Sequence, residues 1–145
     1  MHYHIYCNNK NISTHHLSAI EEFQKRLSAY CETTLHVHIS LALPKDLNPT
    51  NHHFLFIQSG ISTYTSEQFA DYINTLQHSG QSTIHVIIGY DESSFYDAIS
   101  HNADYNIPTY LSLTNCSLSP DTKTLLFYEQ LYRGYTILQG KTYHK

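Results

Sequence analysis

Short hydrophobic runs recur along the chain and predict a set of strands. Residues 2–7 alternate between apolar and polar side chains, which is typical of a strand with one face in a core. Residues 35–39 repeat that alternation. Residues 54–57 and 83–88 are largely continuous apolar runs, as expected of strands covered on both faces. A fifth, short strand is predicted at residues 110–113.

Apolar residues at helical spacing predict helices between these strands. A helix that Ser13 or Thr14 caps would bury one stripe of side chains, formed by Leu17, Ile20, Phe23, Leu27 and Tyr30. The tetrapeptide 65–68 fits a capping box and opens a second helix, with Gly80 after its end. That helix turns Phe69, Ile73 and Leu76 inward. Two further helices are expected over residues 93–101 and 122–138.

The alternation of strands and helices predicts one α/β domain over residues 1–145, with a mainly parallel sheet flanked by helices. Ligands of such sheets bind outside the carboxyl ends of the strands. These ends fall near Ser59-Gly60, Gly89-Tyr90 and Ser112–Ser119, so the sequence predicts a pocket there. A loop is expected over Pro44–Asn51, which contains two prolines and two asparagines.

Length and composition fit a single globular domain. The chain has 145 residues, of which 41% are hydrophobic and 14% charged. The apolar runs are too short to span a bilayer, and the first residues lack the pattern of a secretory signal, so a cytoplasmic location is expected. Cys7, Cys31 and Cys116 are far apart and odd in number, so we interpret them as core-filling side chains rather than disulfides.

Charge is distributed unevenly along the chain. Residues 122–145 carry four basic side chains against Glu129, a net charge of +3, while the rest carries −7. This basic tail also contains four tyrosines: Tyr128, Tyr132, Tyr135 and Tyr143. Tyrosine with Arg and Lys suits stacking on an unpaired base and contact with phosphate. Packing of these rings in a core or a subunit interface is the alternative interpretation.

Two side-chain patterns have competing interpretations. Glu129 and Arg133 stand four residues apart on the last helix, as a simple surface ion pair or as a pair that orients the tail over a substrate. Twelve histidines raise the possibility of a zinc or copper site. Its ligands would be His2, His4, His36 and His38, if adjacent strands bring them to one point. Strand alternation alone explains these residues, so no metal site is predicted.

General catalytic templates are missing from the sequence: it has no GxGxxG, GxxxxGK[ST], HExxH or GxSxG motif. Several segments, in order, nevertheless resemble the RlmH family of SPOUT-class RNA methyltransferases. These are Arg26–Cys31, Gly60 with Thr65–Ala70, Ile87–Gly89, Ser112–Thr114, Leu125–Arg133 and Tyr143–Lys145. The likeness covers most of the chain.

The resemblance implies a homodimer with a C-terminal trefoil knot that binds S-adenosylmethionine and methylates N3 of a pseudouridine in 23S rRNA of the ribosome. It implies cofactor contacts from Phe56, Gly89, Thr114, Asn115, Cys116, Ser117, Leu118 and Ser119. The implied catalytic residues are Glu129, Arg133, Tyr143 and His144. The implied RNA-binding residues are Tyr132, Arg133, Lys141 and Lys145. Glu129, Tyr143 or His144 would assist removal of the N3 proton, and Arg133 would stabilise the anionic base.

Three segments depart from the family pattern. Tyr90 follows Gly89 where the family has a second glycine, and Ser119-Pro120 replaces Pro-His after the cofactor loop. The loop 44–51 replaces a helix between the second and third strands. A ring of Tyr90 in the cofactor pocket would favour the alternative function, an inactive paralogue that binds RNA or a partner as a dimer. An open cleft beside Gly89 and residues 114–119 would favour the enzyme.

Overall fold

The computed structural model describes the chain apart from residues 46, 48–49, 61, 100–107 and 143–145. The strands are β1 (His2–Cys7), β2 (Glu32–Val37), β3 (His52–Ile57), β4 (Thr83–Ile88) and β5 (Thr109–Leu111). The helices are α1 (Thr14–Leu27), α2 (Ser66–His78), α3 (Glu92–Ile99) and α4 (Pro120–Leu138). All strand pairs are parallel, in the order β2-β1-β4-β3-β5. The predicted α/β fold with a parallel sheet is confirmed.

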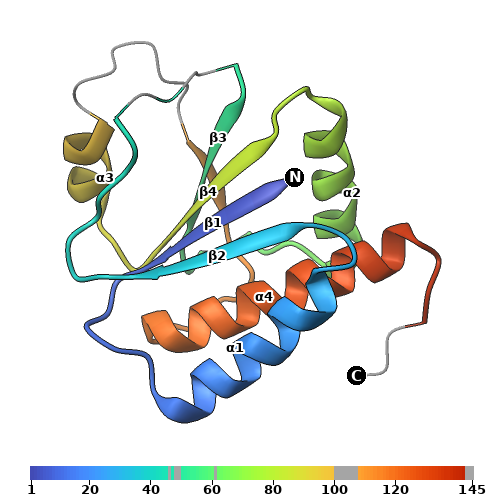
Figure 1. Cartoon of the computed structure of the whole chain (residues 1–145), viewed down its shortest axis with the longest axis horizontal. Coiled ribbons are helices and arrows are strands. Elements are labelled where there is room, and N and C mark those ends of the chain that lie inside the picture. The colour runs from blue at the N-terminus through green and yellow to red at the C-terminus, as the bar shows by residue number, and fades with distance from the viewer. Residues whose placement is uncertain (46, 48–49, 61, 100–107, 143–145) are drawn as a thin grey trace.

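Helices cover the two faces of the sheet unequally (Figure 1). The helices α1, α2 and α4 lie together on one face, where Ile5, Leu55 and Val86 join Phe127 and Leu131 in the main core. On the other face α3 covers only part of the sheet. Its side of the sheet holds a second apolar cluster, formed by Tyr6, Leu47, Phe54, Phe56, Ile87, Tyr90 and Phe95.

Local signals fix several element boundaries. The capping box forms as predicted, since the Gln68 backbone N–H donates to Thr65 Oγ1 at 3.2 Å and the Thr65 N–H donates to Gln68 Oε1 at 2.9 Å. Gly80 follows α2 with a φ of +81°, the left-handed conformation that ends many helices. Ser119 caps α4, and Pro120 takes the first helical position, so the helix starts two residues before the predicted one.

Some sequence predictions are wrong at the element ends. Leu17 is 38% exposed, and Tyr30 lies in the turn after α1, so neither extends the buried helical stripe. The second strand ends at Val37, and Ile39 is 65% exposed. The partner strand β1 ends at Cys7, opposite Val37, and the His38 carbonyl beyond it accepts a hydrogen bond from the Tyr90 hydroxyl. Cys116 is exposed, unlike Cys7 and Cys31, because it lies in a surface loop.

The trefoil knot stays a prediction. The third predicted helix is found as α3, and its predicted last residues, 100 and 101, lie outside the described residues. Within the described part of the chain, no helix combines the length and the apolar character needed to cross a bilayer.

Candidate functional site

The predicted site is the edge where β3, β4 and β5 end, and two loops meet there. The Gln58 N–H donates to the Leu111 carbonyl at 3.0 Å, and Ser59 Oγ donates to the Cys116 carbonyl at 2.9 Å. The loop of residues 114–119 is also folded on itself, since the Cys116 N–H donates to Thr114 Oγ1 at 3.1 Å. The loop after β3 (residues 58–60) and the loop after β5 (residues 112–119) are therefore joined, and we call these two loops the rim.

Gly89 brings the end of β4 against this rim. Its φ is +83°, and a Cβ there would lie 2.8 Å from Pro120 Cγ and 3.2 Å from Asn8 Cβ. The Asn8 amide donates to the Gly89 carbonyl at 2.9 Å. Only glycine allows the chain to pass so close to the start of α4. Sequence reasoning missed Asn8, although its place directly after a buried strand is a usable signal.

Asp121 in the first turn of α4 makes a further contact that sequence reasoning missed. Its carboxylate accepts hydrogen bonds from the Asn9 side chain and, at 3.3 Å, from the Ser13 N–H. The loop after β1 is thereby fixed to the same helix start that Gly89 touches. The loop after β1, the end of β4 and the start of α4 therefore meet at this corner of the sheet.

Tyr90 turns away from the rim. Its hydroxyl donates to the carbonyls of Cys7, at 3.2 Å, and of His38. Both acceptors lie at the ends of β1 and β2, on the opposite side of β4 from β3 and β5. Burial raises the pKa of Tyr90 to about 12, so the hydroxyl stays a donor at neutral pH. The ring is therefore packed in the second apolar cluster and not wedged into the loop 114–119.

Replacing Tyr90 by Phe is expected to cost about 1 kcal/mol of unfolding free energy, because the carbonyls of Cys7 and His38 lose a donor while the packing stays. Binding of any ligand at the rim should not change, since the ring does not line it. Urea unfolding and ligand titration of Y90F measure the two quantities. Weaker ligand binding without further loss of stability would place the ring at the site after all.

Phe56 is the next-to-last residue of β3. Its ring belongs to the second apolar cluster, with centroids 6.2 Å from Phe95 and 5.5 Å from Tyr110. It thus borders the predicted pocket on the α3 side of the sheet. The remaining predicted contacts, Thr114 to Ser119, run directly into the cap of α4.

Two of the predicted catalytic residues, Glu129 and Arg133, lie toward the other end of α4. Arg133 Nε donates to Glu129 Oε1 at 3.0 Å, and Gln130 donates to Glu129 Oε2 at 2.6 Å. The side chains of Arg133 and Glu129 are only 18% and 19% exposed. Arg133 Nη1 also reaches Ser66 Oγ at 3.4 Å, which ties the pair to the start of α2. The pair is thus part of a fixed network and not a loose surface contact.

Aromatic and basic side chains gather beside that network. The Arg26 guanidinium lies 5.8 Å from the centre of the Tyr132 ring, and Lys141 Nζ lies 5.3 Å from the centre of the Tyr30 ring. Tyr132 also contacts Tyr30, with centroids 6.5 Å apart. Tyr128 and Tyr135 are buried, which confirms core packing for these two rings. The predicted site residues Tyr143, His144 and Lys145 lie outside the described residues.

The length of α4 separates the two groups of predicted residues. Arg133 follows the cap residue Ser119 by fourteen positions on one helix, a rise of about 21 Å. The Ser119 end of the rim and Arg133 therefore lie far apart along α4.

The histidines of the sheet are grouped differently from the set that the sequence suggested. His2, His4 and His36 lie together, but the rings that complete the group are His52 and His85, not His38. Among the described residues, no three or more His, Cys, Asp or Glu side chains are arranged to hold a metal ion. The four-histidine site is therefore not formed. Strand register, which the sequence pattern does not reveal, brings in β3 and β4.

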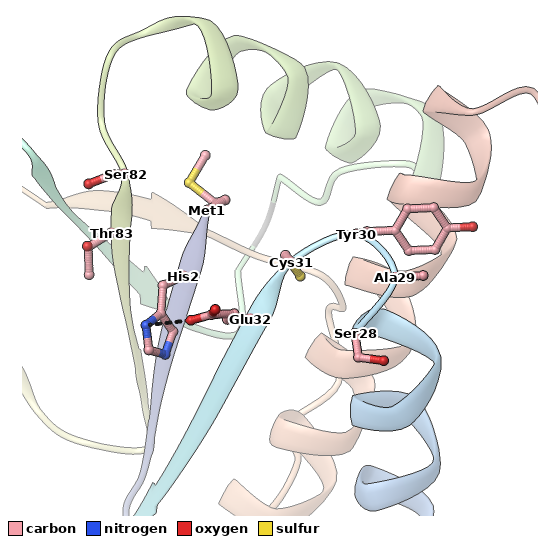
Figure 2. A pocket seen from close by; sticks show the side chains of 9 residues that line it. All are labelled: Met1, His2, Ser28, Ala29, Tyr30, Cys31, Glu32, Ser82 and Thr83. Atoms are coloured by element: carbon pink, nitrogen blue, oxygen red, sulfur yellow. Dashed lines mark ion pairs between the residues drawn. The ribbon is translucent and has the colours of Figure 1, made fainter.

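A pocket of about 500 Å³ lies at the amino-terminal edge of the sheet, opposite the predicted site (Figure 2). His2 and Glu32 point toward each other across it, with Nδ1 and Oε2 3.6 Å apart. Cys31 lies on its wall, and burial raises the pKa of the Cys31 thiol to about 12. A thiol with that pKa is not a nucleophile at neutral pH.

Comparisons with known proteins point to one family. Residues 40–144 match the family described as predicted SPOUT methyltransferase. The chain is 33% identical to ribosomal RNA large subunit methyltransferase H 1 of Thermoanaerobacter sp. strain X514, over the full length of both proteins. It is 29% identical to ribosomal RNA large subunit methyltransferase H of Flavobacterium psychrophilum, over 94% of this chain and 91% of that one. The protein of the same name from Coprothermobacter proteolyticus is 28% identical, over 87% and 86%.

Proposed function

The chain belongs to the RlmH family of SPOUT methyltransferases, and on that premise we propose that it methylates N3 of a pseudouridine in 23S rRNA with S-adenosylmethionine as methyl donor. The observation that carries the proposal is the position of Tyr90. The hydroxyl of Tyr90, the residue that replaces a family glycine, bonds to the carbonyls at the ends of β1 and β2 and not to the rim of β3, β4 and β5. This argues against an inactive paralogue.

The residues of the rim suit the cofactor. Gly89 presents backbone without a side chain, and the loop of Thr114, Asn115, Cys116, Ser117, Leu118 and Ser119 offers hydroxyl and backbone groups beside it. An adenosyl group needs an apolar wall and a few polar contacts, and Phe56 and Leu118 would supply the wall. When bound, S-adenosylmethionine supplies a methyl group on a positively charged sulfur, which is already a strong electrophile. The protein then has mainly to align donor and acceptor.

The acceptor side of the reaction falls to the end of α4 and the tail. N3 of the base must lose its proton, which leaves a negative charge that Arg133 stabilises. Glu129 accepts hydrogen bonds from both Arg133 and Gln130, so we assign it as a positioning residue for Arg133. Tyr143 and His144 remain the proton acceptors of the proposal. Tyr132, Lys141 and Lys145 would contact the neighbouring nucleotides, with stacking by the ring and phosphate binding by the amines.

A homodimer would complete the site. Ser119, at the end of the rim, and Arg133 are separated by about 21 Å along α4. A second copy that lays its α4 end against the rim closes that separation, and the twofold symmetry of a dimer then forms two such sites. The partners in this proposal are therefore a second copy of the chain and 23S rRNA within the ribosome.

Calorimetric titration with S-adenosylmethionine and with its demethylated product tests the cofactor step. Both ligands are expected to bind, and both should raise the unfolding temperature, because ligand binding to the folded state stabilises it. Transfer of labelled methyl groups to ribosomes that lack this modification tests the acceptor. Absence of heat and of thermal stabilisation at millimolar ligand would contradict the proposal, and cofactor binding without methyl transfer would restrict it to binding.

A further inference from the structure

Five histidine rings form a connected group on the α3 side of the sheet. His4 stacks between His36 and His85, with centroids 5.3 and 5.4 Å away, and His85 stacks on His52 at 5.2 Å. His2 stacks on His4 at 4.1 Å. These rings come from four adjacent strands, so they cross β2, β1, β4 and β3 in order. We call His2, His4, His36, His52 and His85 the histidine ladder.

Hydrogen bonds between ring nitrogens join the ladder. His4 Nδ1 and His36 Nε2 are 3.1 Å apart, and His52 Nδ1 and His85 Nε2 are 2.9 Å apart. Each contact needs one N–H and one lone pair, because two N–H groups cannot face each other at this distance. A pair in which both rings are protonated therefore loses its bond and gains a repulsion between two positive charges.

Few groups around the ladder can compensate such charge. Tyr6 of β1 contacts His85, with its hydroxyl 3.1 Å from Nδ1, and burial raises the pKa of Tyr6 to about 12. Glu32 of β2 is the carboxylate that pairs with His2. His38 lies near His36 and would add positive charge, Tyr90 near Tyr6 is neutral, and Phe54 of β3 stacks on His85 at 5.1 Å. Among the described residues, the five imidazoles of the ladder therefore have one carboxylate partner, Glu32, which pairs with His2 alone.

On this face α3 covers only the β3–β4 part of the sheet. His85 is 1% exposed, but the other four rings are only partly buried, so protons reach them from water. The edge strand β2 contributes His36 to the ladder. The His4–His36 bond is thus a side-chain link between β1 and that edge.

We propose that the histidine ladder makes the sheet sensitive to acid. At neutral pH its contacts stabilise the packing of β2, β1, β4 and β3 side by side, and this stabilisation is lost when its rings become protonated. The device is independent of methyl transfer and of the rim. It requires no ligand other than the proton.

The direction of the pKa shifts agrees with this device. Burial, followed by the neighbouring rings, lowers the pKa of His85 to about 3 and that of His4 to about 4, and burial lowers those of His36 and His52. An unfolded chain has histidine pKa values of about 6.5. Below that pH the unfolded state binds more protons than the folded state. The stability that neutral rings provide is complete above pH 6.5 and declines as the pH falls toward 4.

Urea unfolding between pH 7.5 and 4.5 tests the device with matched variants. The double variant His4→Gln/His36→Gln removes the His4–His36 bond between β1 and β2 and leaves the contacts of His2 with Thr34 and Glu32 in place. The variant His15→Gln removes an exposed histidine of α1 outside the ladder. On acidification, the unfolded-to-folded ratio of the wild-type chain should rise roughly tenfold or more beyond that of the double variant, and H15Q should follow the wild type. Equal pH dependence of all three proteins would overturn the proposal.

NMR titration of the histidine rings in the wild-type chain supplies a test that needs no variant to fold. The rings of His4 and His85 should titrate well below about pH 6.5, the value in an unfolded chain, or remain neutral until the protein unfolds. Midpoints between pH 6 and 7 for all ladder rings would overturn the proposal, whatever the activity of the protein. Loss of the acid effect and loss of methyl transfer are therefore distinguishable.

Discussion

Gly89→Ala is expected to lower the free energy of unfolding by about 2 to 4 kcal/mol and to abolish binding of S-adenosylmethionine. A side chain at φ +83° costs about 1 kcal/mol or more. The added Cβ would also lie 2.8 and 3.0 Å from two ring carbons of Pro120, so the start of α4 must move. Overpacking of this kind costs about 1 to 3 kcal/mol. Because Ser119 caps the same helix, the displacement carries the loop of residues 114–119, the proposed cofactor loop, with it.

Gly80→Ala is the matched control for this substitution. Gly80 has nearly the same φ, +81°, but a Cβ there would have no neighbour within 4 Å. Its replacement should cost only the conformational strain, about 1 kcal/mol, and leave ligand binding unchanged. Urea unfolding and calorimetry of both variants separate strain from displacement. Equal losses in the two variants would mean that the contact between Gly89 and Pro120 is not rigid.

The sequence predicts those features of the fold that depend on neighbours along the chain. The bounds of β1 and β4 agree with the predicted strands, and the capping box at Thr65 forms, because alternation and capping are local patterns. Leu17 and Ile39 were assigned to the interior by the same patterns, yet both are exposed. The pattern shows which residues lie on the same face of a helix or strand. It does not show whether another element covers that face, because this depends on tertiary packing.

The candidate site shows the same division. The carboxyl ends of β3, β4 and β5 are recognisable in the sequence, and the structure joins their loops through Ser59 and Cys116. The direction of the Tyr90 ring is not recognisable, because it depends on the carbonyls of Cys7 and His38, which are 83 and 52 residues away. Membership of His52 and His85 in the ladder likewise depends on strand register, in which His4 and His85 are partners across β1 and β4.

Mixed dimers are expected to recover activity that neither of two inactive variants has alone. Gly89→Ala damages the rim, and Arg133→Ala removes the cation at the far end of α4. In a site formed by the rim of one copy and the tail of the other, a mixed dimer has one site with both parts intact. An equal mixture forms mixed dimers in half of the population, so about one quarter of the wild-type methyl transfer should return.

Co-expression of the two variants with different affinity tags, followed by tandem purification, isolates the mixed dimer. The purified mixed dimer should then have about half of the wild-type activity, since one of its two sites is complete. Each variant expressed with both tags is the control and should stay inactive. Activity of the mixed dimer at the level of these controls would mean that rim and tail meet within one chain.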